Sequence, residues 1–345
     1  MIFLLLIIAF LIVSCSARND GRFIDPLEHF NDQPAYQLKA NNRIDLDCYE
    51  IYKPWAITRE KGTYFIYDDV GHDLIKVLNP QKGTIKKGVN RGSGPGEIIL
   101  SEGFYKMEST TGLIENNRMM LYKLNVSTDS VYLTPHIDYN SFQFLYNPAF
   151  YNDRIISTAF NDSVWIRYYE GNRLVSTIDY PHFEETEHLS GGDMAWAFIS
   201  MRFRFKPDGK RAVGALQSGC LISFFDCTES GISESVQHKY FPLDFAYTGK
   251  ESRSIGETPD CRVGFCGLTC TDNYIYALYS GKTMENLTSA FRASHVFVYD
   301  WEGRPVKRYE LEKELFGDIG VDEDAGILYG ISYDPEGCII EYKLN

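Results

Sequence analysis

The chain has 345 residues, a formal net charge of −13, 44% hydrophobic residues and 14% aromatic residues. The hydrophobic fraction is that of a globular protein with a sizeable core, which excludes disorder over most of the chain. The acidic balance argues against nucleic acid as a partner, because phosphate binding needs a basic face. Length alone admits one large all-β domain or two ordinary domains.

The first 14 residues predict an export signal. Residues 1–14 are apolar, carry no charged side chain, and have the length of a signal-peptide core rather than the roughly 20 residues of a membrane span. The Ile12–Cys15 stretch resembles a bacterial lipobox, in which the cysteine becomes the lipidated first residue of the mature chain. The Lys or Arg that usually follows Met1 is missing here. The alternative is a plain secretory peptide in which Cys15 is incidental.

The lipobox resemblance implies a protein that is held to a membrane through a lipid anchor on Cys15. Several acyl chains hold a protein to a bilayer more firmly than one chain does. Ser16 in place of an aspartate suggests the outer membrane, by analogy with enteric lipoproteins, with the protein facing either the periplasm or the outside. Residues 15–35 are polar and rich in turn formers, so we expect a flexible tether there.

Short strand signals then recur along the whole chain. They are apolar, β-branched or aromatic runs bounded by Gly, Asp, Asn and Pro, which is the pattern of an all-β protein. Helical periodicity is confined to two short candidates, Glu310–Leu315 and Asp25–Phe30, so the crossover helices of an α/β fold are missing. The predicted strands cover residues 63–67, 74–78, 119–124, 130–133, 155–159, 164–169, 173–178, 201–205, 211–216, 220–226, 274–279, 295–300, 305–309, 327–333 and 338–344.

The strand pattern repeats loosely, which points to a six-bladed β-propeller. Residues 295–309 have the form of the outer half of a blade, two strands joined by an Asp-x-x-Gly turn. The last repeat is too short for four strands, so we predict that residues 36–51 supply its outermost strand and close the ring, since an open sheet edge is a liability. Two separate β-sandwiches are the alternative. The predicted blades cover residues 52–100, 101–147, 148–200, 201–255, 256–312 and 313–344, within a propeller domain of residues 36–345.

The most specific segment of the body is Arg-Gly-Ser-Gly-Pro-Gly-Glu-Ile at residues 91–98. It resembles the G-x-GPGE-F/I stretch of six-bladed, TolB-like or NHL-like propeller lipoproteins of Bacteroidetes. The lipobox and the C-terminal segment Tyr329–Asp334 agree with that family. The resemblance implies a fold and an envelope location rather than a reaction. Arg91 and Glu97 are candidate ligand-binding residues at the mouth of the ring. The alternative is an inter-blade turn that contacts no ligand.

The eight cysteines leave several possibilities open. Without Cys15 seven remain, an odd number, so at least one is free or pairs between chains. Cys261, Cys266 and Cys270 are spaced more widely than the paired ligands of a structural zinc site, and no histidine lies near them in the sequence. The alternatives are a metal site, a disulfide within residues 261–270 or 220–227, and ordinary buried thiols.

Two arginines alternate with apolar residues in the predicted strand Met201–Phe205. A period of two places Arg202 and Arg204 on one strand face. From an innermost strand they would line the central channel and bind an anionic group in a bidentate manner. The alternative is an outer strand with solvated arginines.

Aromatic residues are abundant, with 24 Tyr, 22 Phe and 4 Trp. Most are expected to pack between sheets, as large apolar side chains do in a propeller. Trp55, Trp196 and Trp301 are candidates to lie at loop tips, where they would stack on sugar rings.

Two polar segments are weak metal candidates, although we expect no metal or cofactor. His182 and His188 flank three carboxylates, a donor set that suits zinc, manganese or iron. Asp322 and Asp324 have the carboxylates to help hold calcium. The alternatives are a solvated loop for the first segment and a plain β-turn for the second.

No catalytic motif identifies a reaction. The chain has no G-x-S-x-G nucleophile elbow and no H-E-x-x-H motif, and we assign no catalytic residue. The first hypothesis is an envelope-anchored binding or scaffolding lipoprotein that presents a propeller face to a glycan or a partner protein. The alternative is a propeller-type hydrolase or lyase that acts on a sugar or lactone at the channel mouth.

Overall fold

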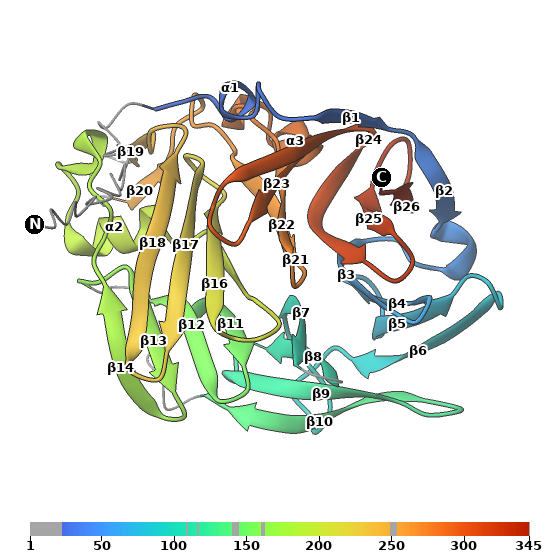
Figure 1. The fold of residues 1–345 in the computed structure, drawn as a ribbon. Coiled ribbons are helices and arrows are strands. Elements are labelled where there is room, and N and C mark those ends of the chain that lie inside the picture. The colour runs from blue at the N-terminus through green and yellow to red at the C-terminus, as the bar shows by residue number, and fades with distance from the viewer. Residues whose placement is uncertain are drawn as a thin grey trace, which may run out of the picture.

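The structure, a computed structural model, describes residues 23–107, 110–115, 117–139, 145–159, 163–248 and 254–344. Residues 1–14 and Cys15, where the signal peptide and the lipid anchor were expected, lie outside these residues. Within them, antiparallel sheets surround a central axis and the helices are short (Figure 1). The predicted all-β, six-bladed propeller is confirmed, and the two β-sandwiches are excluded.

Each blade is an antiparallel sheet whose four strands run in order from the axis outwards. Blades 1 to 3 comprise β3 (Pro54–Glu60), β4 (Thr63–Asp68), β5 (Asp73–Asn79) and β6 (Thr84–Asn90); β7 (Ser101–Met107), β8 (Thr110–Glu115), β9 (Met120–Val126) and β10 (Val131–Asp138); and β11 (Leu145–Tyr151), β12 (Arg154–Ala159), β13 (Ile166–Glu170) and β14 (Arg173–Ile178).

The remaining blades use the C-terminal half of the chain and one N-terminal strand. Blades 4 to 6 comprise β15 (Met201–Phe205), β16 (Arg211–Leu216), β17 (Leu221–Thr228) and β18 (Gly231–Lys239); β21 (Phe265–Cys270), β22 (Tyr274–Tyr279), β23 (Arg292–Asp300) and the first part of β24 (Pro305–Asp322); and the second part of β24, β25 (Ile327–Ser332), β26 (Cys338–Lys343) and β2 (Ala40–Asp45).

The connections hold the other elements. They are a hairpin of β19 (Phe245–Thr248) and β20 (Ser254–Glu257), the helices α1 (Pro26–His29), α2 (Gly191–Ala197) and α3 (Leu287–Ala290), and single 3₁₀ turns at Asp47–Tyr49, Glu184–Thr186 and Met284–Asn286. Among the described residues, no helix is long and apolar enough to cross a bilayer.

Strand β24 belongs to two blades. Its first part pairs with β23 through Val296–Tyr309, and its second part pairs with β25 from Phe316 to Asp322. The helix predicted over Glu310–Leu315 is therefore wrong, because this stretch carries the chain in extended form from the outer edge of blade 5 to the centre of blade 6.

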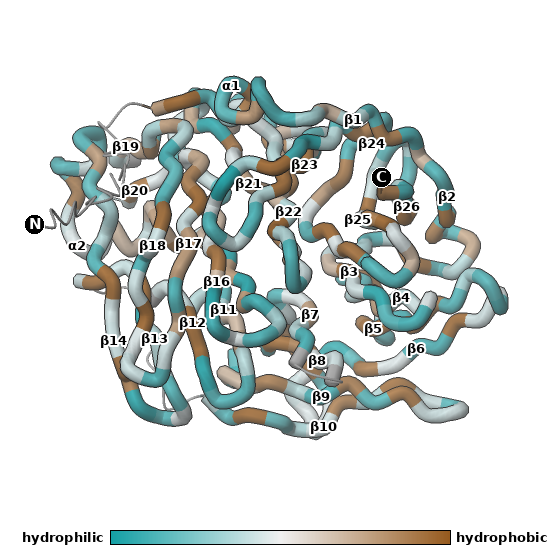
Figure 2. Tube along the Cα trace, viewed as in Figure 1, coloured by the Kyte–Doolittle hydropathy of each residue, from teal (hydrophilic) through white to brown (hydrophobic). Residues whose placement is uncertain are grey.

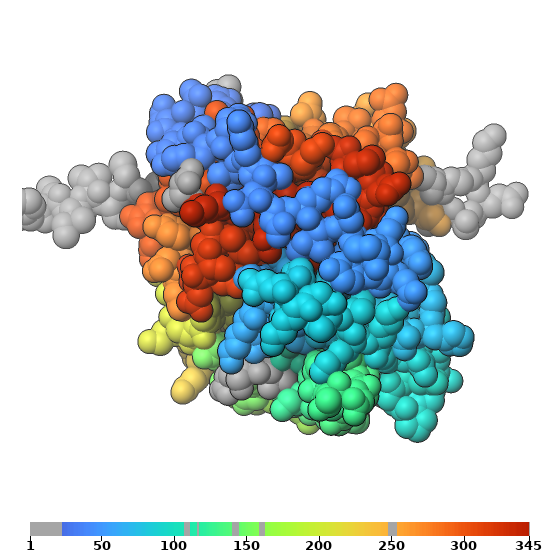
Figure 3. Space-filling view, turned by 90° about the vertical axis from the view of Figure 1, so that its right-hand side faces the viewer, coloured from blue at the N-terminus to red at the C-terminus, as the bar shows by residue number. Residues whose placement is uncertain are grey.

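The N-terminal segment closes the ring. Strand β2 pairs antiparallel with β26, from Ala40–Tyr342 to Asp45–Cys338, as predicted for residues 36–51. Strand β1 (Ala35–Leu38) adds a parallel pairing with β24 that the sequence analysis did not foresee. Figure 3 shows this blue segment lying across the red C-terminal strands. The two strands thus connect blade 5 to blade 6.

Residues 23–35, which we expected to be tether, pack on the ring. Asp25 caps α1 by accepting a hydrogen bond from the Leu27 amide at 2.8 Å, as its position before a proline predicts. Phe30 is fully buried, with its ring centroid 4.6 Å from Phe297 and 5.0 Å from Tyr299. The packed domain therefore begins before residue 36. We call residues 23–45 the N-terminal strap.

The core is divided among the six interfaces between neighbouring blades, and each of the six buried apolar clusters joins two blades. Hydrophobic residues follow the strands and hydrophilic ones the turns (Figure 2). Tyrosine and phenylalanine fill these interfaces, which explains the aromatic content. The seven cysteines from Cys48 onward are free thiols, and all except Cys48 and Cys270 are buried.

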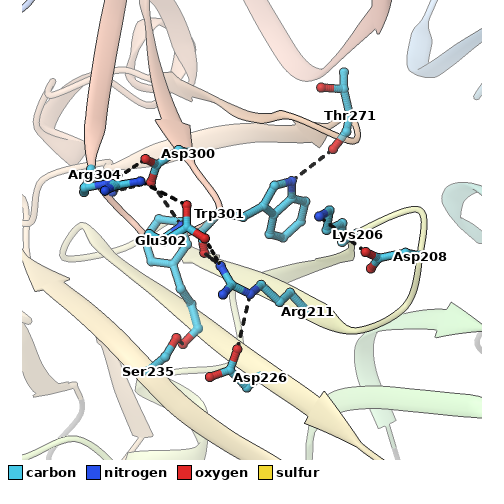
Figure 4. A network of polar contacts seen from close by, with 11 residues as sticks. Lys206, Asp208, Arg211, Asp226, Ser235, Thr271, Asp300, Trp301, Glu302 and Arg304 are labelled. Atoms are coloured by element: carbon cyan, nitrogen blue, oxygen red, sulfur yellow. Dashed lines mark hydrogen bonds and ion pairs between the residues drawn. The ribbon is translucent and has the colours of Figure 1, made fainter.

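A polar network also joins blades 4 and 5 (Figure 4). Arg211 of β16 donates to the Trp301 carbonyl and to Glu302 at 2.7 Å each. The Trp301 indole N–H donates to the Thr271 carbonyl at 3.1 Å, and only 4% of the side chain is exposed. The suggestion that Trp301 stacks on a sugar is therefore wrong, because the ring is part of the interface.

Candidate functional site

The innermost strands of all six blades, β3, β7, β11, β15, β21 and β24, line a central channel. It holds a cavity of about 390 Å³, which Ile114 and Tyr329 also border. The walls are mainly apolar and aromatic. The charged lining residues are Lys106, Arg204, Lys206 and Asp318. The channel is therefore the place where side chains from every blade converge.

The predicted alternation along Met201–Phe205 places two arginines at the channel. Met201, Phe203 and Phe205 are buried, whereas Arg202 and Arg204 are half-buried. Arg204 donates to Asp318 at 2.5 Å, and Arg202 lies 3.6 Å from the other oxygen of the same carboxylate. That oxygen also accepts from the Leu268 amide at 3.2 Å.

Asp318 lies on β24, 114 residues from Arg204 in the sequence, and no pattern along the sequence pointed to it. Strand β15 is an innermost strand, so the arginines are not solvated on an outer edge. Arg204 lines the cavity, and Arg202 is brought beside it by their common partner.

The 91–98 segment forms the connection from β6 to β7. Arg91 donates to Asp69 at 2.6 Å and to the Ile99 carbonyl at 3.2 Å. Glu97 folds back and accepts from the Gly94 amide at 2.8 Å. A Cβ atom on Gly92 would collide with an oxygen of that carboxylate, so a larger residue there would push the Glu97 side chain aside. Neither Arg91 nor Glu97 lines the cavity.

The two exposed tryptophans lie apart in the fold. Trp55, 45% exposed, is the second residue of β3, and its ring meets Phe316 of β24 edge to face with the ring centroids 5.9 Å apart. It is therefore near the channel mouth, where blades 1 and 6 meet. Trp196, 41% exposed, lies on α2, in the connection from blade 3 to blade 4.

The metal candidates do not assemble into a ligand set. His182 is exposed and lies 3.7 Å from Glu187, while the His188 ring contacts Tyr247. Asp322 forms an ion pair with Arg59 and accepts from the Ala325 amide at 3.0 Å, and Asp324 lies in the adjoining turn. Within the described residues, no three His, Cys, Asp or Glu side chains form a group suited to a metal ion.

An exposed apolar surface on blade 1 was missed by the sequence analysis. We call Tyr52, Trp55, Val70, Ile99 and Leu100 the blade 1 patch; each of these side chains is more than 40% exposed. They belong to three chain segments that meet at this end of blade 1. The pattern along any one segment is too short to have revealed the patch.

Polar contacts show that the three segments are adjacent. The Asp69 amide donates to the Lys53 carbonyl at 2.9 Å, and the Arg91 guanidinium bridges Asp69 and Ile99. The Lys53 ammonium lies 2.9 Å from the Asp69 carboxylate. Arg91 and Lys53 together hold the pKa of Asp69 below its usual value. Two cations thus share one carboxylate within the patch.

Six radial sheets around a channel define a β-propeller. The sequence matches the family described as TolB-like 6-blade propeller-like over residues 30–324, and the chain belongs to that family.

Solved structures similar to this chain include another propeller. The Myceliophteria thermophila Cps50 (Swd1) β-propeller domain has a TM-score of 0.51 and 7% identity, over 89% of this chain and all of that one. This likeness shows the fold alone. Kuenenia stuttgartiensis hydrazine synthase has a TM-score of 0.46 and 10% identity, over 84% and 96% of the two chains. The designed Ika8 protein has a TM-score of 0.39 and 12% identity, over 84% and 71%. Among curated proteins, none matches.

Proposed function

We propose that this propeller is an envelope-anchored binding lipoprotein that docks a partner protein on the blade 1 patch. The observation that carries the proposal is the gathering of five exposed large apolar side chains from three segments around one charged centre. Exposed apolar side chains that gather at one end of a blade are typical of an interaction site. A rigid propeller presents such a surface without reorganising.

The composition of the patch favours a protein over a glycan. Val70, Ile99 and Leu100 are aliphatic, whereas sugar rings stack on aromatic faces. Lys53 and Arg91 share the single carboxylate of Asp69, so the patch is locally positive on a chain of net charge −13. The partner surface that complements it is apolar and bears carboxylates.

The anchor is part of the same proposal. The apolar residues 1–14 and the lipobox-like Ile12–Cys15 support lipidation of Cys15 and sorting to the outer membrane of a Bacteroidetes cell, on either side of that membrane. Residues 15–22 would connect the lipid to the N-terminal strap. The protein would hold its partner close to the membrane.

The enzyme alternative has no observation in its favour. A hydrolase or lyase at the channel mouth needs histidines or carboxylates that converge on a substrate. Among the described residues, no histidine lines the cavity, and the lining carboxylate, Asp318, is already engaged by two arginines.

The test is a matched pair of substitutions in a soluble protein that begins at Ser16. Leu100→Asp places a charge in the patch, and Leu287→Asp places one on an exposed leucine of α3, in the connection between β22 and β23. The protein is cross-linked to isolated envelopes, and the cross-linked partner protein is identified. Saturable binding is then measured with the purified partner. We expect Leu100→Asp to abolish binding and Leu287→Asp to preserve it. Equal binding by both variants, or selective binding to a glycan array with no protein partner, would overturn the proposal.

A further inference from the structure

Two connections beside blade 4, across the ring from the blade 1 patch, form a second surface with a chemistry of its own. The connection from blade 3 to blade 4 carries α2, and the connection from blade 4 to blade 5 carries the hairpin of β19 and β20. They lie side by side (Figure 1), and the Tyr247 hydroxyl of β19 donates to the Asp193 carboxylate of α2 at 2.8 Å. We call His188, Asp193, Trp196 and Tyr247 the α2 ledge.

The α2 ledge is firmly supported. The Asp193 carboxylate also accepts hydrogen bonds from the Ser190 hydroxyl at 2.7 Å and from the Ser190 amide at 3.2 Å, which completes the capping box of α2. Ala197 is buried in the apolar cluster between blades 3 and 4, and Met194 and Ile255 of β20 pack against the same cluster. Side chains on such a support need little reorganisation in order to bind a ligand.

Two aromatic side chains of the ledge are exposed. Both Trp196 and Tyr247 belong to the exposed large apolar residues of the chain. Trp196 follows Asp193 by three residues on α2, so the two side chains lie on the same face of the helix. Asp193 in turn binds the Tyr247 hydroxyl. The His188 ring meets the Tyr247 ring edge to face, with the ring centroids 6.0 Å apart. The two exposed aromatics therefore flank one carboxylate.

The surroundings of these rings are polar and acidic. Residues 179–200 contain no lysine or arginine, and His182 and His188 are exposed there. A sugar ring has apolar faces that stack on aromatic side chains and hydroxyl groups that donate to carboxylates and imidazole. An apolar peptide would bury the carboxylates without partners, and an acidic sugar would be repelled by them. The carboxylates of this connection are those of Asp179, Glu184, Glu185, Glu187 and Asp193.

We propose that the α2 ledge binds a neutral oligosaccharide. One sugar ring stacks on Trp196, the next contacts Tyr247, and their hydroxyl groups donate to the neighbouring carboxylates. The ledge and the blade 1 patch use different elements of the ring. The proposal therefore stands or falls independently of partner docking.

The test measures binding of cello-, manno-, xylo- and chito-hexaose to the soluble protein that begins at Ser16, by isothermal titration calorimetry. Hexamannuronate is the anionic counterpart of mannohexaose. We expect at least one neutral hexaose to bind in a saturable manner and hexamannuronate not to bind. Failure of every neutral hexaose to bind at millimolar concentration, or tighter binding of hexamannuronate, would overturn the proposal.

Variants then assign the binding to the ledge. Trp196→Ala is expected to weaken the affinity for the bound hexaose by about tenfold, as the loss of one aromatic contact implies, and Trp196→Phe to retain most of it. Trp55→Ala is the matched control, because Trp55 is exposed to a similar extent but lies in the blade 1 patch; it should leave hexaose binding unchanged. Unchanged affinity in Trp196→Ala, or an equal loss in Trp55→Ala, would refute the assignment.

Two further measurements keep the test decisive. If Trp196→Ala lowers the Tm, Tyr247→Ala on the neighbouring hairpin takes its place, and unchanged hexaose affinity in that variant would count against the ledge. Trp196→Ala should preserve binding of the partner protein, whereas Leu100→Asp should preserve binding of the hexaose. Failure of the sugar site and failure of the docking site are therefore distinguishable.

Discussion

Phe30→Ala tests whether the N-terminal strap is an integral part of the ring. Phe30 is fully buried against Phe297 and Tyr299. Removing a buried phenylalanine ring costs about 4 kcal/mol, from the lost transfer free energy and the cavity left behind. For a chain of 345 residues the unfolding entropy is large, so this loss lowers Tm by only about 6 °C. The free energy of unfolding is therefore the more sensitive quantity.

The assay is urea unfolding of the soluble protein, followed by fluorescence and by far-ultraviolet circular dichroism. Leu27→Ala is the matched control, because Leu27 lies on the same short helix and is 37% exposed; its expected cost is within about 0.5 kcal/mol. A loss below about 1 kcal/mol for Phe30→Ala would show that the strap detaches without disturbing the ring, contrary to the packing described above.

Three further predictions concern ionisable groups. Burial, with His238 nearby, lowers the pKa of His29 from 6.5 to about 4. The unfolded state therefore binds more protons, and the free energy of unfolding falls as the pH drops from 6.5 to about 4. His29→Asn should make the urea midpoint depend less on pH in this range, and an unchanged pH dependence would contradict the prediction. Cys48 is the exposed thiol, so a thiol reagent should label one cysteine in the native soluble protein and seven after unfolding. Rapid labelling of more than one cysteine in the native protein would contradict this prediction. Arg59→Met leaves the largely buried Asp322 unpaired and should lower the free energy of unfolding by about 3–5 kcal/mol. The double variant with Asp322→Asn should recover part of this loss in the same urea assay, and no recovery would argue against an ion pair.

Much of the fold was predictable because local sequence patterns determine the strands and turns. Period-two apolar runs and their turns gave the six blades, and the shortness of the last repeat showed that residues 36–51 must complete it. The N-terminal part of the strap, residues 23–35, was not expected to pack. Its few apolar residues are separated by polar ones, so the burial of Phe30 depends on a pocket that only the assembled blades 4 and 5 provide.

Two local errors have clear physical reasons. Leu311 and Leu315 are both buried and spaced as on a helix, but the spacing arises because one long strand changes blades between them. Helix α2 was taken for a loop, since two glycines open it. Its signal was present in Ser190 and Asp193, which form a capping box.

The candidate site was less predictable than the fold. The alternation of Arg202 and Arg204 indicated one strand face correctly. Their partner Asp318 could not be inferred, because which inner strands meet across the channel depends on ring closure. The same holds for the blade 1 patch, whose members come from three turns that are separated along the chain.

The pairing of β2 with β26 also sets an order of assembly. Ala40 pairs with Tyr342, so a chain that is synthesised from its N-terminus holds β2 unpaired until almost its last residues are made. Contacts between such distant residues form slowly. Until then β2 has a free edge that can pair with other chains. A copy cut short before Cys338 would keep the β2 edge free permanently and would be a target for aggregation or degradation.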